Sequence, residues 1–155
     1  MKEILEIKPL TGFGDIKFGA GQGEVEKILG PPQETETIDV EEEIHEVVVW
    51  SYWEQGHAVY FEKDLGDVCT NFETDNENAL LFGKKIFKLG QDEIIGLMKE
   101  NGFEEHEIEE DEDLDEKIIF FGGAHMQFVF DDDSLALVSW AVAMDDEENI
   151  RWPGK

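Results

Sequence analysis

The feature that most restricts the fold is a match between the two halves of the chain at a constant offset in numbering (90 − 21 = 69). Gly21–Val25 falls on Gly90–Ile94, and Ile28–Leu29 falls on Leu97–Met98. Self-similarity at a fixed offset is the signature of repeated structural units. The match predicts one domain of two tandem units, about residues 15–83 and 84–152. The alternative is a chance match between generic amphipathic patterns.

Each unit is predicted to begin with a short helix, over Gly21–Leu29 and Gly90–Asn101. Apolar side chains at positions i, i+3 and i+4 give each helix one apolar stripe. The first helix should end at Gly30, which two prolines follow, and the second near Gly102. Glycine permits a left-handed cap, and proline cannot continue a helix.

An acidic loop is expected after each helix, followed by runs rich in β-branched and aromatic residues. Short turn-prone segments between these runs predict antiparallel hairpins. The runs are Glu46–Trp53, His57–Glu62, Val68–Thr74, Lys117–Phe121, His125–Phe130 and Leu135–Met144, with Ile4–Leu10 and Ala79–Phe87 as possible additional strands. The predicted class is α+β, with one curved antiparallel sheet of six to eight strands and both helices on one face.

The charge balance decides which partners are plausible. Twelve basic residues against thirty-nine acidic residues give a net charge of −27. Such a field repels phosphate backbones and anionic lipids, which argues against nucleic-acid and membrane-surface binding. It attracts basic proteins and cations. The alternative is that the charge provides solubility alone, and the oligomeric state stays open.

The first residues and the cysteine content favour a cytoplasmic location. Met1–Pro9 has no apolar core of the signal-peptide kind. The single cysteine, Cys69, excludes an internal disulfide and suits a reducing compartment. Because Cys69 lies within a predicted strand, an inert buried thiol is expected.

The opening of the first unit resembles a known family. Ile16–Gly19, Glu24-Val25 and Ile28–Pro32 are similar to the first helix of the SmpA/OmlA lipoprotein family, a glycine-preceded helix that ends in Leu-Gly-x-Pro. The two tandem helix-plus-strands units resemble the β-lactamase inhibitor protein family, whose repeats form a curved sheet. The resemblance implies a fold whose known members mostly bind other proteins, although fold alone does not establish function.

No catalytic, cofactor or metal motif is recognised, so the chain is predicted to be a non-enzyme without cofactor or metal. Asp111–Asp115 imitates the start of a calcium loop, but the sixth position is Glu116 and the twelfth is Gly122. The four histidines lack zinc-site spacing. The alternative is a small enzyme or ligand-binding protein that uses Glu62 and Asp131 with His57 or His125.

Aromatic residues on the predicted strands are the candidate partner-binding residues. With helices on one face of the sheet, some of these side chains should stand on the uncovered face, where Tyr and Trp are common interface anchors. Filling the core is the competing interpretation. The leading hypothesis is a non-catalytic binding module, such as an immunity protein or inhibitor of a basic protein, with anchors Trp50, Tyr52, Tyr60, Phe72 and Trp140.

Overall fold

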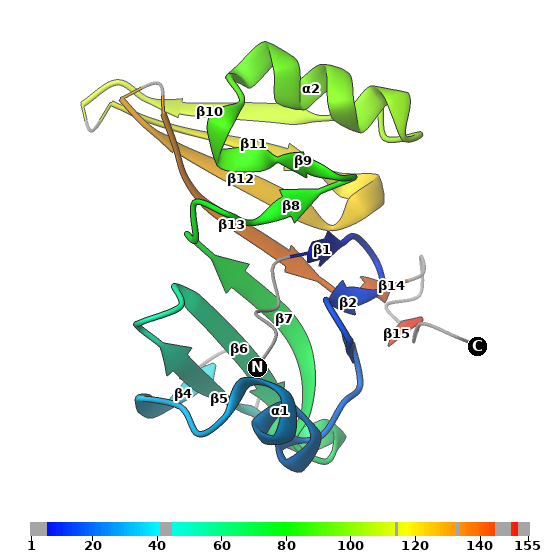
Figure 1. The fold of residues 1–155 in the computed structure, drawn as a ribbon, viewed down its shortest axis with the longest axis vertical. Helices are drawn as coiled ribbons and strands as arrows, with labels where there is room; N and C mark the ends of the chain where they lie inside the picture. Colours follow the sequence, from blue (N-terminus) through cyan, green and yellow to red (C-terminus); the bar gives the residue numbers. More distant parts are fainter. Residues whose placement is uncertain (1–5, 41–44, 114, 133, 145–149, 152–155) are drawn as a thin grey trace.

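The chain folds into an α+β structure with two helices and mostly antiparallel strands (Figure 1). The computed structural model describes residues 6–40, 45–113, 115–132, 134–144 and 150–151. The strands form an eight-stranded sheet, a five-stranded sheet of very short strands and a two-stranded pair. No described helix has the length and apolar character needed to cross a membrane.

Both predicted helices are present, as α1 (Gln22–Leu29) and α2 (Gln91–Glu100). Each begins after an extended glycine, and in α2 the side chain of Glu93 accepts a hydrogen bond of 3.1 Å from the Gly90 backbone N–H. The apolar stripe of α2 is buried, and in α1 Val25 and Leu29 are buried while Ile28 is partly buried. Gly30 ends α1 at φ +83°, a conformation that favours glycine.

The main sheet is antiparallel throughout and has a symmetrical strand order. Each half of the chain supplies four consecutive strands, and the two sets meet through their last strands. In order across the sheet the strands are β10 (Glu107–Asp111), β11 (Glu116–Phe121), β12 (Met126–Asp131), β13 (Ser134–Ala141), β7 (Val68–Thr74), β6 (His57–Glu62), β5 (His45–Tyr52) and β4 (Glu34–Val40).

The acidic segments after the helices were expected to be loops, and this expectation was wrong for both. They contain β4 and β10, the two edge strands of the main sheet. Every described side chain of these two strands is exposed, so neither shows the buried-exposed alternation that identifies a strand from sequence.

The additional runs at Ile4–Leu10 and Ala79–Phe87 do form strands, but these lie outside the main sheet. Residues 4 and 5 lie outside the described part. The small sheet has the order β3-β2-β1-β8-β9, and β1 pairs with β8 in parallel. Its strands are β1 (Glu6–Lys8), β2 (Gly12–Phe13), β3 (Ile16–Lys17), β8 (Leu80–Leu81) and β9 (Lys84–Lys85). The two-stranded pair consists of β14 (Ala143–Met144) and β15 (Ile150–Arg151). The 3-10 turns of the described chain are η1 (Lys63–Leu65), η2 (Ile86–Lys88) and η3 (Gly122–Ala124).

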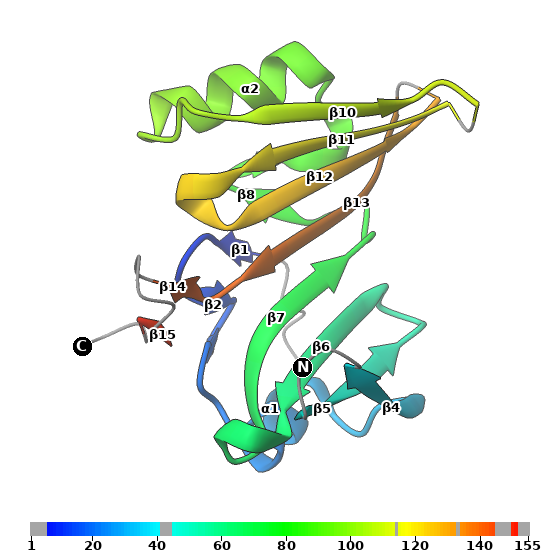
Figure 2. The same cartoon turned by 180° about the vertical axis from the view of Figure 1, so that it is seen from behind.

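The core lies between the main sheet and a layer made of both helices and the small sheet. Figures 1 and 2 show this layer on one side of the main sheet. At its centre the Phe13 ring lies edge-on to Trp140, with centroids 5.1 Å apart. The Trp140 indole Nε1–H donates a 2.9 Å hydrogen bond to the Gly12 carbonyl, which ties the small sheet to the junction of β7 and β13.

The offset of the sequence match does not extend beyond β6 and β12. The offset of the sequence match relates the start of β6 to the start of β12 (126 − 57 = 69), and register irregularities occur at the matching steps Tyr60/Phe61 and Val129/Phe130. On the next strands, Tyr60 pairs with Asn71 of β7, and Val129 pairs with Leu137 of β13. A second, smaller offset therefore relates β7 to β13 (137 − 71 = 66). The turn between β12 and β13 is correspondingly shorter than the turn between β6 and β7.

Candidate functional site: the open face of the main sheet

The open face is the side of the main sheet that points away from the helices and the small sheet. Successive side chains of a strand point to opposite faces. In β6 the residues His57, Val59 and Phe61 are buried, whereas the alternate residues Ala58 and Tyr60 are partly exposed. In β12 the same alternation is present. The partly exposed set defines the open face, on which Figure 2 draws no helix.

One row of paired residues crosses all eight strands on this face. Register connects its members without interruption, and none of them is fully buried. At a strand spacing of about 4.8 Å the row is roughly 34 Å long. We call it the central row; from β4 to β10 it consists of Glu34, Ser51, Ala58, Glu73, Ser139, Gln127, Phe120 and Glu107.

The middle of the central row holds a hydrogen-bonded carboxylate. Glu73 on β7 pairs directly with Ser139 on β13, where the two halves of the sheet meet. The Tyr60 hydroxyl donates a hydrogen bond of 2.5 Å to Glu73 Oε1. Burial, followed by this bond and the charge of Glu73, raises the pKa of Tyr60 well above its ordinary value. The phenol therefore stays a neutral donor, and the carboxylate keeps further acceptor positions toward solvent.

An apolar patch lies beside the central row on the second half of the sheet. Ile118, Val129 and Leu137 are paired across three strands, and each is partly exposed. The Phe120 side chain, which belongs to the central row, is 41% exposed. Together these four residues provide the kind of apolar surface that a partner can cover.

The charges of the main sheet are almost all negative. Seven of its eight strands carry at least one Asp or Glu. Within the eight strands as described, Lys117 is the single Lys or Arg. Its ammonium group donates a 2.8 Å hydrogen bond to Gln91 of α2 and lies 3.6 Å from Glu110. This cation therefore belongs to the helix side of the sheet, and the open face has a negative potential.

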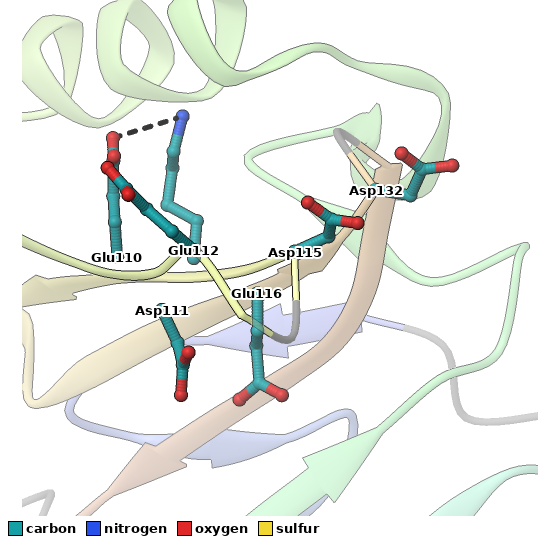
Figure 3. Close-up of a pocket in the computed structure, with 7 residues that line it drawn as sticks. Glu110, Asp111, Glu112, Asp115, Glu116 and Asp132 are labelled. Carbon is teal, nitrogen blue, oxygen red and sulfur yellow. Dashed lines mark ion pairs between the residues drawn. The ribbon is translucent and has the colours of Figure 1, made fainter.

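The β10–β11 hairpin carries the densest group of carboxylates, shown in Figure 3. Glu110 and Glu112 point to the side of α2, whereas Asp111 and Glu116 point away from it. Among the described residues, no set of three or more His, Cys, Asp or Glu side chains has the geometry to hold a metal ion. The hairpin extends the negative field of the open face beyond the edge of the sheet.

Four of the five predicted anchors need correction, because they lie on the covered face. Relative exposures are 8% for Trp50, 0% for Tyr52 and Phe72, and 1% for Trp140. Alternation of side chains along the strand predicts that Trp50 and Tyr52 lie on the same face of the sheet, but it does not predict which face the helices cover. These four side chains fill the core, and Tyr60 is the member of the set that reaches the open face.

Two exposed aromatic side chains were missed among the candidate anchors. Phe120 stands in the central row, and Trp53, which follows β5, is 66% exposed. A signal was available for both residues. Trp53 is adjacent to Tyr52, and Phe120 lies between Ile119 and Phe121. Because successive side chains of a strand point to opposite faces, each of the two is expected to point away from its buried neighbours.

The structure does not bring together the residues of the enzyme alternative. His57 is buried at the start of β6, with Nδ1 2.8 Å from the Thr74 hydroxyl, whereas Glu62 is at the other end of the strand and on the other face. Asp131 ends β12 and is exposed. His125 follows η3 in a left-handed conformation. The arrangement gives no acid–base pair among these four side chains.

Comparisons with known proteins give little beyond this geometry. No family model and no curated protein matches the chain. A crystal structure of an extracellular protein containing a SCP domain from Bacillus anthracis str. Ames is similar, with a TM-score of 0.47 and 14% sequence identity. The match covers 89% of this chain and 49% of that chain, so the chain spans about half the length of that protein. Likeness at this level carries no argument about function.

Proposed function

We propose that the protein is a non-catalytic binding module that captures a basic protein on the open face of its main sheet. The observation that carries the proposal is the central row. It offers a partner a surface with carboxylates at both ends and at the middle, and with partly exposed uncharged side chains between them. The apolar patch beside the row adds uncharged surface that a partner can cover.

Charge complementarity chooses the class of partner. Carboxylates of β4, β10 and the β10–β11 hairpin surround the open face, and the described strands place Lys117 on the other side. A cationic surface would be steered toward this face, and an acidic surface would be repelled. The most concrete version of the proposal is an immunity protein or inhibitor that neutralises a basic protein.

The same proposal includes a tandem duplication as the origin of the row. Under the offset of the sequence match Ser51 corresponds to Phe120 and Ala58 to Gln127, while the second, smaller offset relates Glu73 to Ser139 (139 − 73 = 66). The paired residues Glu73 and Ser139 would then lie on a pseudo-two-fold axis between β7 and β13. A duplicated unit therefore explains how one interaction surface extends evenly over both halves.

A charge-matched pair of variants tests the proposed function. Basic proteins captured from the native host at low salt would be purified, and their affinity for the wild type would be measured by calorimetry. Ser139→Arg places a long cation beside Glu73 in the middle of the central row, and we expect it to weaken binding at least about tenfold, since it combines steric block with like charge. Asn78→Arg changes the net charge by the same amount in an exposed loop.

The control decides how the result is interpreted. Asn78→Arg should lower the affinity only by the small amount that follows from one unit of net charge. If both variants bind like the wild type, or if both lose the same affinity, the open face is not the binding surface. Thermal unfolding of each variant checks that the fold is intact.

A further inference from the structure

A recess lies at the end of the central row, where β10 and β11 pair. It is lined by Glu105, His106, Glu107, Phe120, Gly122 and Gly123. Phe120 and Glu107 are direct cross-strand partners, so an aromatic ring and a carboxylate stand side by side at the opening. Both glutamates of the recess are exposed and available to a ligand.

Gly122 keeps one side of the Phe120 ring uncovered. A Cβ atom at position 122 would lie 3.8 Å from Cε1 of Phe120, in ordinary van der Waals contact with the ring. Glycine at this position leaves that space to a ligand. The backbone at Gly122 is outside the left-handed region, so alanine can replace glycine there without strain.

We propose that this recess binds the guanidinium group of an arginine side chain on the basic partner. The inference rests on the proposed function and names the chemical group that the site recognises. A planar guanidinium can stack on an aromatic face and at the same time form paired N–H···O bonds with a carboxylate. A lysine ammonium is a compact, strongly hydrated charge that cannot make this combination.

The position of the recess agrees with this assignment. Glu105 and Glu107 are separated by one residue, so either carboxylate can meet a guanidinium that lies on the Phe120 ring. The His106 imidazole is held from the other side, with Nδ1 3.0 Å from the Glu104 carbonyl and its ring against Phe121 at 5.3 Å. The imidazole therefore leaves the Phe120 ring and the two carboxylates to a ligand.

The test compares two peptides of equal charge, fluorescently labelled nona-arginine and nona-lysine, by anisotropy at neutral pH and physiological salt. Phe120→Leu keeps an apolar side chain but removes the aromatic ring. We expect the affinity for nona-arginine to fall about two- to fivefold in this variant, the range for an exposed cation–π contact, and the affinity for nona-lysine to fall less. Gly122→Ala, which places a methyl group against the ring, should act in the same direction.

Ile108→Leu is the matched control. Ile108 is 42% exposed, against 41% for Phe120, and it lies on the adjacent strand in the neighbouring register pair, on the other face. Its replacement should leave both affinities unchanged. Equal losses for the two peptides in Phe120→Leu, or no loss at all, would overturn the arginine recess.

A third variant separates the two proposals. If Ser139→Arg weakens peptide binding while Phe120→Leu does not alter the preference for arginine, the recess is refuted and the open face stands. If Ser139→Arg and Phe120→Leu both bind the peptides like the wild type, the peptides bind elsewhere and both proposals fail. Backbone amide shifts that map to the central row in the wild type would support the first proposal directly.

Discussion

Ionisation of the Cys69 thiol should make the fold less stable in mild alkali. Cys69 lies on β7 with a relative exposure of 0%, and its Sγ–H donates a 3.3 Å hydrogen bond to the Lys17 carbonyl. Burial raises the pKa of this thiol from 9.0 to about 11. Between these values the unfolded chain releases a proton that the folded chain keeps. The free energy of unfolding therefore falls as pH rises through this interval.

The two pKa values determine the size of the effect. For one group that titrates at 9.0 when unfolded and at about 11 when folded, linkage gives a loss of about 1 kcal/mol between pH 8 and pH 10. Burial also raises the pKa values of Tyr52, to about 12 from 10.0, and of Tyr60, and both phenols weaken the fold mainly above pH 10. The difference between the wild type and a variant without the thiol isolates the contribution of Cys69.

Urea denaturation at pH 8, 9 and 10, followed by tryptophan fluorescence under reducing conditions, measures the loss. Cys69→Ala should be less stable than the wild type at pH 8, because the variant loses buried sulfur contacts. Its free energy of unfolding should then decline by about 1 kcal/mol less over the series. Parallel pH profiles for the wild type and the variant would refute the reasoning.

Three further substitutions test the packing, each by urea denaturation at pH 7. Trp140→Phe leaves the Gly12 carbonyl without its buried donor and should cost about 1–3 kcal/mol; a change within error would argue against that bond. Gly12→Ala would place Cβ 1.9 Å from the Ile16 carbonyl oxygen, so a loss of at least about 1–3 kcal/mol is expected, and normal stability would contradict the close approach. Lys63→Met breaks a 2.7 Å ion pair with Glu46 between half-exposed side chains and should lower the free energy of unfolding by less than about 1 kcal/mol. A larger loss would contradict the treatment of this contact as a weak surface ion pair.

The helices and the inner strands could be predicted from the sequence because burial leaves a pattern there. The stripe that contains Val25 and its counterpart at Ile94 gave both helices to within one residue of their observed bounds. The prediction of β6 as His57–Glu62 was confirmed at both ends. The strand needed apolar residues at every second position, and the helices needed them three and four positions apart. Both patterns can be recognised without the structure.

The edge strands and the choice of face could not be predicted in the same way. β4 and β10 are held by backbone bonds to one neighbour and bury no described side chain, and Glu is depleted in strands. For Trp50 and Tyr52, alternation fixes their relation to each other but not to the helices. The position of the helices depends on contacts between segments far apart in the chain, which local patterns do not contain.

The acidic edge strands β4 and β10 also disfavour pairing with a second copy of the chain, which leaves the open face to a different partner. An edge strand normally invites pairing with another edge. In β10 four of five residues are carboxylates, so antiparallel pairing of two copies would set like charges opposite each other, which is destabilising. The same side chains would attract a cationic surface. On our proposal one set of carboxylates therefore has two effects, since it disfavours self-association at the edges and directs a basic partner to the face between them.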